Sequence, residues 1–250
     1  MSGDHGRPVA VVIPAKDEAE RIGATIRAAA SLPGVDLVVV VDDGSRDDTQ
    51  SVARQAGAVV ARHARNRGKA AAMQTGAAVV ERRDQHEGRA GAARRLLLFV
   101  DADLEDSAVE VGVLVPPVAG GEADLAIATL PPQRSAGGGR GFVVRLAREG
   151  IRSLTGWTPA QPLSGMRCLS REAYDAAQPF AAGWGVETAM TIDVLAAGLR
   201  VVEVPCALHH RVTGSDWRGQ LHRAAQYRDV WRALAVRRLR ARRAGRRAPD

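Results

Sequence analysis

Four short apolar runs in the first hundred residues constrain the fold of this chain more than any other feature. They lie at residues 9–13, 37–41, 58–61 and 96–100, and helical patterns separate them at residues 18–30, 45–56 and 69–80. Because the runs are continuously apolar rather than alternating, they indicate parallel strands that are buried on both faces of a sheet. Helices between such strands predict an α/β fold with a doubly wound, mostly parallel sheet. Ligands bind beyond the carboxyl ends of the strands in sheets of this kind.

The second half of the chain has a less regular pattern. It predicts strands at residues 125–129 and 200–204, helices at 141–154, 186–197 and 217–243, and a Pro/Gly-rich loop at 131–139. The sequence contains no internal repeat and no clean linker. We therefore expect a single domain over residues 1–231, with residues 8–110 and 111–231 as its two halves, followed by a basic tail at 232–250.

The formal net charge of +7 is concentrated in this tail. Residues 232–250 contain eight arginines and one acidic residue, so their charge equals that of the whole chain and the body is formally neutral. A specific nucleic-acid partner is therefore not expected, whereas the tail allows a weak contact with an acidic membrane surface. Cys168 and Cys206 lie far apart and the first residues show no apolar signal, so we expect a cytoplasmic setting.

Two nucleotide-binding motifs are missing from the sequence. Pro14–Glu18 follows the first strand and contains no G-x-G-x-x-G turn. Gly68-Lys69 is followed by Ala70 and lacks the upstream glycine of a phosphate loop, so dehydrogenases and P-loop proteins are left without their main signature. Asp43 follows the second strand and can accept hydrogen bonds from a base or a ribose. Ser45 and Asp48 predict a capping box at the start of the next helix.

The fourth strand ends in the most informative segment, Asp101-Ala102-Asp103-Leu104-Glu105. Acidic side chains that leave a buried strand are costly unless something compensates their charge, and a hard divalent cation with oxygen ligands does so. Alternate residues of an extended segment point to the same side, so Asp101 and Asp103 can converge on one ligand.

Three further segments add groups that bind anions or metals. Lys69, one of only two lysines in the chain, stands after Gly68 at the start of a helix and can reach a phosphate. Residues 137–140, Gly-Gly-Gly-Arg, suit a phosphate or a carboxylate. His210, after the late strand, can complete a metal shell that carboxylates begin.

Taken together, four ordered motifs resemble the family-2 glycosyltransferases of the GT-A fold. They are VVIPAKDEAERI, VVVVDDGSRDDT, RNRGKAAAMQTGA and LFVDADLED, spread over residues 8–110. The D-A-D segment matches the metal-binding D-x-D signature of that fold. Within the family, GGGR, QPLSGMRCLSREAY and GWGVETAMTID resemble stretches of the glucosyl-3-phosphoglycerate synthases.

The resemblance implies a role for each matching residue. Pro14, Ala15, Glu18, Asp43, Lys69, Asp101 and Ala102 would bind the nucleotide sugar, with Asp43 at the uracil base and Lys69 also serving the reaction. Asp103 and His210 would hold Mg²⁺ or Mn²⁺. Gly139 and Arg140 would bind the anionic group of a small acceptor, and Glu187 would lie near the sugar and acceptor hydroxyls.

These roles imply a metal-dependent glycosyltransferase that moves glucose from UDP-glucose to a small anionic acceptor such as a 3-phosphoglycerate-like acid. Residues 8–110 would then be the nucleotide-sugar-binding half, residues 111–231 a smaller acceptor-side half, and the enzyme a homodimer.

Two alternatives remain open. Phe142 and Val212 depart from the synthase pattern on its acceptor side, and residues 211–215 resemble the R-x-x-G-x-S region of polyprenyl-phosphate glycosyltransferases. A sugar nucleotidyltransferase is the other alternative, although it would place a glycine-rich basic loop where Pro14–Glu18 stands.

Overall fold

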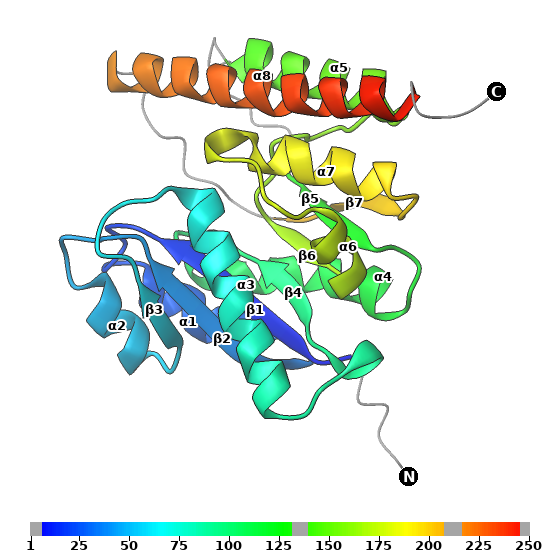
Figure 1. The fold of residues 1–250 in the computed structure, drawn as a ribbon. Coiled ribbons are helices and arrows are strands. Elements are labelled where there is room, and N and C mark those ends of the chain that lie inside the picture. Colours follow the sequence, from blue (N-terminus) through cyan, green and yellow to red (C-terminus); the bar gives the residue numbers. More distant parts are fainter. Residues whose placement is uncertain (1–6, 132–139, 208–216, 246–250) are drawn as a thin grey trace.

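A seven-stranded sheet with helices on both faces forms the body of the protein (Figure 1). The computed structural model describes residues 7–131, 140–207 and 217–245. The strand order is β3-β2-β1-β4-β6-β5-β7. The strands are β1 (Val9–Ala15), β2 (Val35–Asp42), β3 (Val59–Arg62), β4 (Leu96–Phe99), β5 (Leu125–Thr129), β6 (Arg167–Leu169) and β7 (Val201–Pro205).

Different helices cover the two faces of this sheet. The α-helices are α1 (Ile22–Ala30), α2 (Thr49–Gln55), α3 (Lys69–His86), α4 (Val115–Ala119), α5 (Arg140–Thr155), α6 (Arg171–Ala176), α7 (Val186–Ala196) and α8 (Trp217–Gly245). Three 3₁₀ helices are η1 (Gly91–Ala93), η2 (Glu105–Leu114) and η3 (Gly183–Gly185). Helices α1, α2, η2 and α4 share one hydrophobic core with the sheet, and α3, α6 and α7 share another on the opposite face.

Each central strand feeds both cores, which explains its continuous apolar sequence. Along β1, Val9, Val11 and Ile13 enter the core beneath α1, whereas Ala10 and Val12 enter the core beneath α3. All four residues of β4 are at most 1% exposed. The expected α/β, mostly parallel sheet is thus confirmed, since β1, β2, β3 and β4 pair in parallel.

A third layer lies outside α7. Helices α5 and α8 pack side by side above it (Figure 1), and a separate core that includes Val143, Ile151, Ile192 and Leu234 joins the three helices. Arg237 of α8 pairs with Asp193 of α7 inside this layer.

Strand β6 breaks the parallel pattern and was not expected from the sequence. It pairs antiparallel with both β4 and β5, and it has only three residues. Its first residue, Arg167, is charged but completely buried. A three-residue segment that begins with a charged residue shows neither a continuous apolar run nor an apolar/polar alternation. The hydrophobic pattern of the sequence therefore could not predict this strand.

The expected capping box at Ser45 and Asp48 is wrong. Helix α2 begins at Thr49, and the side chain of Asp48 makes no capping hydrogen bond. Instead, the Ser45 hydroxyl accepts a hydrogen bond of 2.9 Å from the amide of Asp17. This contact ties the loop after β2 to the loop after β1. Both cysteines are buried and free.

Candidate functional site

A cavity of about 420 Å³ opens at the carboxyl ends of β1, β2 and β4, where the fold class predicts a ligand. Its lining includes most of the residues that the motifs single out for the nucleotide sugar. These are Pro14, Ala15, Glu18, Asp43, Lys69 and Asp101. The wall also includes Lys16, Asn66, Gly68, Ala72, Gly183 and Trp184. Ala102 does not line it: this residue is 6% exposed, and its carbonyl accepts a hydrogen bond from Thr25.

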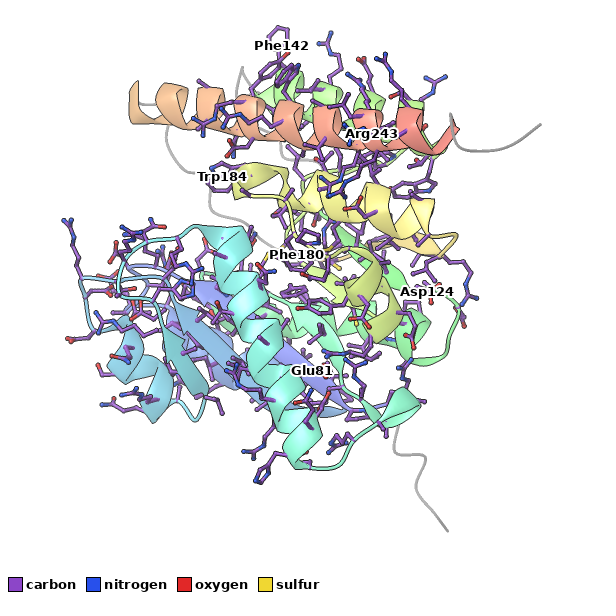
Figure 2. All side chains as sticks on the ribbon, in the orientation of Figure 1. Glu81, Asp124, Phe142, Phe180, Trp184 and Arg243 are labelled. Carbon is purple, nitrogen blue, oxygen red and sulfur yellow. The ribbon has the colours of Figure 1, made fainter. Side chains whose placement is uncertain are left out.

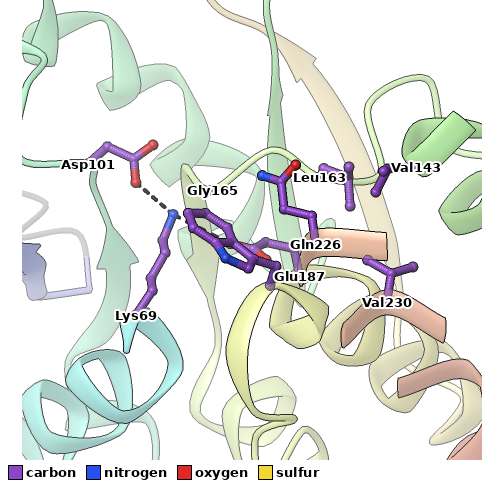
Figure 3. A pocket seen from close by; sticks show the side chains of 9 residues that line it. Lys69, Asp101, Val143, Leu163, Gly165, Glu187, Gln226 and Val230 are labelled. Atoms are coloured by element: carbon purple, nitrogen blue, oxygen red, sulfur yellow. Dashed lines mark hydrogen bonds and ion pairs between the residues drawn. The ribbon is translucent and has the colours of Figure 1, made fainter. Parts of the chain in front are cut away.

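A smaller cavity of about 160 Å³ adjoins the first (Figure 3). Lys69, Asp101 and Trp184 line both cavities, so these three residues stand at the junction between them. The remaining wall of the smaller cavity comes from Val143, Leu163, Gly165, Glu187, Gln226 and Val230. The first half of the chain therefore builds most of the larger cavity, and the second half most of the smaller one.

Lys69 is the charged centre of this junction. Its Nζ donates a hydrogen bond of 2.7 Å to Oδ1 of Asp101 and lies 3.4 Å from Oε1 of Glu187 (Figure 3). Burial alone would lower the pKa of Lys69, but the negative charges of Asp101 and Glu187 outweigh it and hold the pKa above its ordinary value. Lys69 is therefore a permanent cation that neutralises two carboxylates at the meeting point of the cavities.

Gly165 allows the lysine to occupy this position. A Cβ on Gly165 would overlap Nζ of Lys69 and would lie 3.1 Å from Oδ1 of Asp101. The absence of a side chain at this residue is thus a condition for the bridge between Lys69 and Asp101.

Gly165→Ala is expected to lower turnover by about 10- to 100-fold, because displacing a charged group by roughly 1 Å costs this much in a pre-organised site. The fold should survive, since the overlapping atom is the end of a flexible side chain. Gly112→Ala is a matched control, because its Cβ would crowd the side chain of Leu32 in the core, far from the cavities. Steady-state kinetics of the two variants should differ although both lose stability. Equal activity would show that the close packing at Gly165 has no functional role.

Arg167 holds the walls of the smaller cavity in place. Its buried guanidinium donates hydrogen bonds to the carbonyls of Ser164 and Glu187 and to the hydroxyl of Thr191. Burial lowers the pKa of Arg167 to about 10, although the charges of Glu187 and Glu203 oppose this shift. One side chain thereby positions both the loop that contains Gly165 and the first turn of α7, which carries Glu187. Nothing in the sequence pattern singles out Arg167 for this role.

Asp43 organises the loop that precedes Lys69. Its carboxylate accepts hydrogen bonds from the amides of Arg67 and Gly68, at 2.8 and 2.7 Å, and lies 2.6 Å from Nδ1 of His63. His63 is buried and was also missed, since nothing in the sequence links it to Asp43. The carboxylate thus has a structural role in addition to its place in the cavity wall, and its contact with a uracil base stays a prediction.

The acidic residues beside the larger cavity provide oxygen donors that suit a divalent cation. Asp103 is exposed and forms no hydrogen bond or ion pair with any other residue in the described ranges. Burial raises the pKa of Glu18, and the negative charge of Asp103 raises it further, although Arg21 donates hydrogen bonds to the Glu18 carboxylate. The exposed carboxylate of Asp103 fits Mg²⁺ or Mn²⁺, which prefer carboxylate oxygens.

Three of the expected site residues cannot be compared with this geometry. Gly139 and His210 lie outside the described residues, and the side chain of Arg140 is likewise not described. Within the described part of the chain, no group of three or more His, Cys, Asp or Glu side chains is arranged to hold a metal. The expected pairing of Asp103 with His210 therefore stays a prediction.

Trp184 is a further wall residue that was not among the expected site residues. It lies in η3, beside both cavities, and its amide donates a hydrogen bond of 3.3 Å to Asp229 of α8. The neighbouring Gly185 lets the backbone of α8 approach closely, because a Cβ there would lie 2.6 Å from the carbonyl of Asp229. The segment GWGVE was recognised as a motif, but only its glutamate was assigned to the site.

Comparison with known proteins identifies relatives of this architecture. The family model "Glycosyl transferase family 2" matches residues 10–177. The glucosyl-3-phosphoglycerate synthase of Mycolicibacterium paratuberculosis is 33% identical over 209 residues, which cover 75% of this chain and 60% of that protein. The glycosyltransferase AglJ of Haloferax volcanii is 29% identical over 216 residues, covering 83% of this chain and 65% of that protein. The chain thus spans 60–65% of the length of these two curated relatives.

A solved structure extends the similarity to the whole sheet. The Mycobacterium tuberculosis glucosyl-3-phosphoglycerate synthase, in complex with Mn²⁺, UDP and glucosyl-3-phosphoglycerate, superimposes with a TM-score of 0.69 at 29% identity. The match covers 93% of this chain and 80% of that one. The same synthase has been solved with Mg²⁺ and UDP, and with Mn²⁺, UDP-glucose and phosphoglyceric acid. The fold, the motifs and these matches together show that this chain belongs to glycosyl transferase family 2.

Proposed function

We propose that this protein transfers glucose from UDP-glucose to a small anionic acceptor of the 3-phosphoglycerate type, with Mg²⁺ or Mn²⁺ as its cofactor. The observation that carries the proposal is the junction of two cavities at Lys69, Asp101 and Trp184. A transferase needs two adjoining sites that share the reacting centre, one for the donor and one for the acceptor. The structural relatives that bind UDP, metal and phosphoglyceric acid support the identities of the ligands.

The larger cavity is assigned to the nucleotide. Pro14, Ala15, Glu18 and Asp43 line it and are the residues proposed to contact the base and the ribose, whereas Lys69 and Asp101 also line the smaller cavity. This arrangement would place the diphosphate against the ammonium group of Lys69. A fixed cation at that position stabilises the negative charge that develops on the leaving diphosphate as its bond to the sugar breaks.

The metal would supply a second positive charge at the diphosphate. Asp103 is the residue assigned to hold it, with His210 as the expected second ligand. The carboxylate of Asp103 is exposed to solvent and would be accessible to the cation.

The smaller cavity is assigned to the acceptor and the transferred sugar. Glu187 is 4% exposed, and its carboxylate faces Lys69 at 3.4 Å, so it can accept a hydrogen bond from a hydroxyl of the sugar or the acceptor. In the reaction, the bond from the anomeric carbon to the diphosphate breaks, a bond to the acceptor oxygen forms, and the acceptor hydroxyl loses its proton. Gly139 and Arg140 are the residues proposed to bind the anionic group of the acceptor.

Calorimetry with nucleotide sugars tests the donor assignment. UDP-glucose is expected to bind at least about tenfold more tightly with Mn²⁺ than without it, because the metal links the diphosphate to the protein. Titrations with GDP-mannose and with ADP-glucose serve as controls for the base and the sugar. Equal affinities for all three donors, or an affinity for UDP-glucose that does not change when Mn²⁺ is added, would contradict the assignment.

Acceptor screening by mass spectrometry then separates the remaining candidates. A glucosylated phosphoglycerate supports the proposal, whereas a glycosylated polyprenyl phosphate supports the second candidate, which rests on the R-x-x-G-x-S pattern at residues 211–215 outside the described residues. Release of pyrophosphate from UTP and glucose 1-phosphate would instead indicate a nucleotidyltransferase.

A further inference from the structure

The outward face of α8 combines exposed apolar side chains with an excess of arginines. Tyr227, Trp231 and Leu239 are 46%, 53% and 56% exposed. They are spaced by four and eight residues along the helix, and Ala235 lies between Trp231 and Leu239. These residues therefore form one oblique stripe on the helix surface. The opposite side of α8, including Val230 and Leu234, is buried against α5 and α7. The stripe is therefore a second apolar surface, which the described part of the chain leaves uncovered.

The charges on the same helix are almost all positive. Residues 224–243 contain seven arginines and one acidic residue, Asp229. Arg237 is paired with Asp193, and Arg228 with Asp229. The other five are exposed and form no ion pair with a described acidic residue; they are Arg232, Arg238, Arg240, Arg242 and Arg243.

Helix α5 extends this surface. Phe142 is 69% exposed, and the guanidinium of Arg145 lies 5.4 Å from the centre of its ring. Figure 2 shows Phe142 and Arg243 on the outer layer formed by α5 and α8. Aromatic side chains and arginines thus occur together on the two helices that form one side of the molecule.

From this juxtaposition we propose that the α5–α8 face binds the surface of a membrane that contains anionic lipids. Exposed tryptophan and tyrosine rings prefer the boundary between lipid headgroups and acyl chains, and arginines attract acidic headgroups. Helix α8 would lie in the plane of the membrane. None of the described helices is long and apolar enough to cross a membrane.

The charge pattern favours a lipid surface over the other occupants. A symmetric contact between two copies through this face would bring the arginines of both chains together, which is unfavourable. A nucleic acid would satisfy the arginines but offers no apolar layer for Leu239. An anionic membrane supplies both the negative charge and the apolar layer.

This surface and the catalytic junction share one helix. Gln226 and Val230 of α8 line the smaller cavity, while the adjacent residues Tyr227 and Trp231 are exposed on the outward face. Binding through the outward face would therefore hold the acceptor side of the site close to the membrane. The proposal itself does not depend on which acceptor is used, since its test requires no turnover.

Co-sedimentation of the full chain with vesicles provides the test. The probes are vesicles of phosphatidylcholine alone, and of phosphatidylcholine with a quarter of phosphatidylglycerol. The protein is expected to bind the anionic vesicles at least about tenfold more strongly than the neutral ones, and less strongly at high salt. The paired substitution Trp231→Ser and Leu239→Ser should weaken this binding by about tenfold, and so should Arg238→Glu with Arg242→Glu.

Matched controls distinguish binding through this surface from non-specific binding to vesicles. Val109→Ser with Val113→Ser removes two exposed apolar residues of η2, and Arg27→Glu with Arg82→Glu reverses two exposed charges elsewhere. Both control pairs should bind anionic vesicles like the unchanged protein. Circular dichroism and UDP binding confirm that each variant is folded.

Three outcomes would overturn the proposal. The first is vesicle binding that the α8 variants leave unchanged. The second is that the protein does not bind vesicles but binds a single-stranded oligonucleotide through the same arginines. The third is an absence of vesicle binding together with a dimer, seen by sedimentation velocity, that Trp231→Ser dissociates.

Discussion

Asp103→Ala is expected to reduce metal-dependent turnover by a factor of about 10³ or more, because the variant lacks the carboxylate assigned to the cation at the leaving diphosphate. Its fold should be unaffected, since Asp103 is exposed and bonds to no other described side chain. Thermal unfolding should therefore be nearly unchanged while the affinity for Mn²⁺ in the presence of UDP falls. This combination distinguishes a lost ligand from a lost structure.

The control for this variant is Asp106→Ala. Asp106 is an exposed acidic residue in the first turn of η2, three residues further along the chain, and it lines neither cavity. It should retain full activity and full affinity for Mn²⁺. Near-normal turnover by the Asp103 variant would refute the assignment of the metal to this residue.

Lys69→Met should affect both catalysis and stability. The variant keeps most of the volume of the side chain but removes the positive charge that pairs with Asp101 and with the buried Glu187 at the cavity junction. We expect turnover to fall by about 10²- to 10³-fold, as when one electrostatic donor is removed from an active site. The free energy of unfolding should fall by about 1–3 kcal/mol, because two carboxylates lose their hydrogen-bonding cation.

Two further substitutions complete this experiment. Arg67→Met removes an exposed cation two residues away that lines neither cavity, and it should change neither the rate nor the stability appreciably. Lys69→Arg keeps the charge and should recover most of the lost stability. Turnover of Lys69→Met within a few-fold of the unchanged protein would show that the lysine has a structural role only.

The first half of the fold could be predicted because its signals are local. Each central strand is a continuous apolar run, since it feeds the cores on both faces, and each is followed by polar residues at the end where ligands bind. Pro14 lies at the end of β1, and Asp43 and Asp101 follow β2 and β4, so parallel pairing alone brings them to one edge. That is why the expected nucleotide site coincides with a real cavity.

The remaining features depend on contacts between distant segments, which leave no periodic pattern. Strand β6 is three residues long and begins with Arg167. The buried guanidinium of this residue donates hydrogen bonds to carbonyls of a loop and of α7. His63 becomes important only because Asp43 lies against it. The role of Gly165 is visible only once the end of Lys69 is known to occupy the space beside it.

The contribution of α8 to the smaller cavity has a consequence for the order of events during protein synthesis. The ribosome produces the whole sheet and every residue that lines the larger cavity before it reaches Gln226 and Val230. A nascent chain can thus fold the part that builds the larger cavity first, as domains generally do from the N-terminus. The smaller cavity stays incomplete until α8 has emerged and docked, so the compartment proposed for the acceptor would form after the one proposed for the donor.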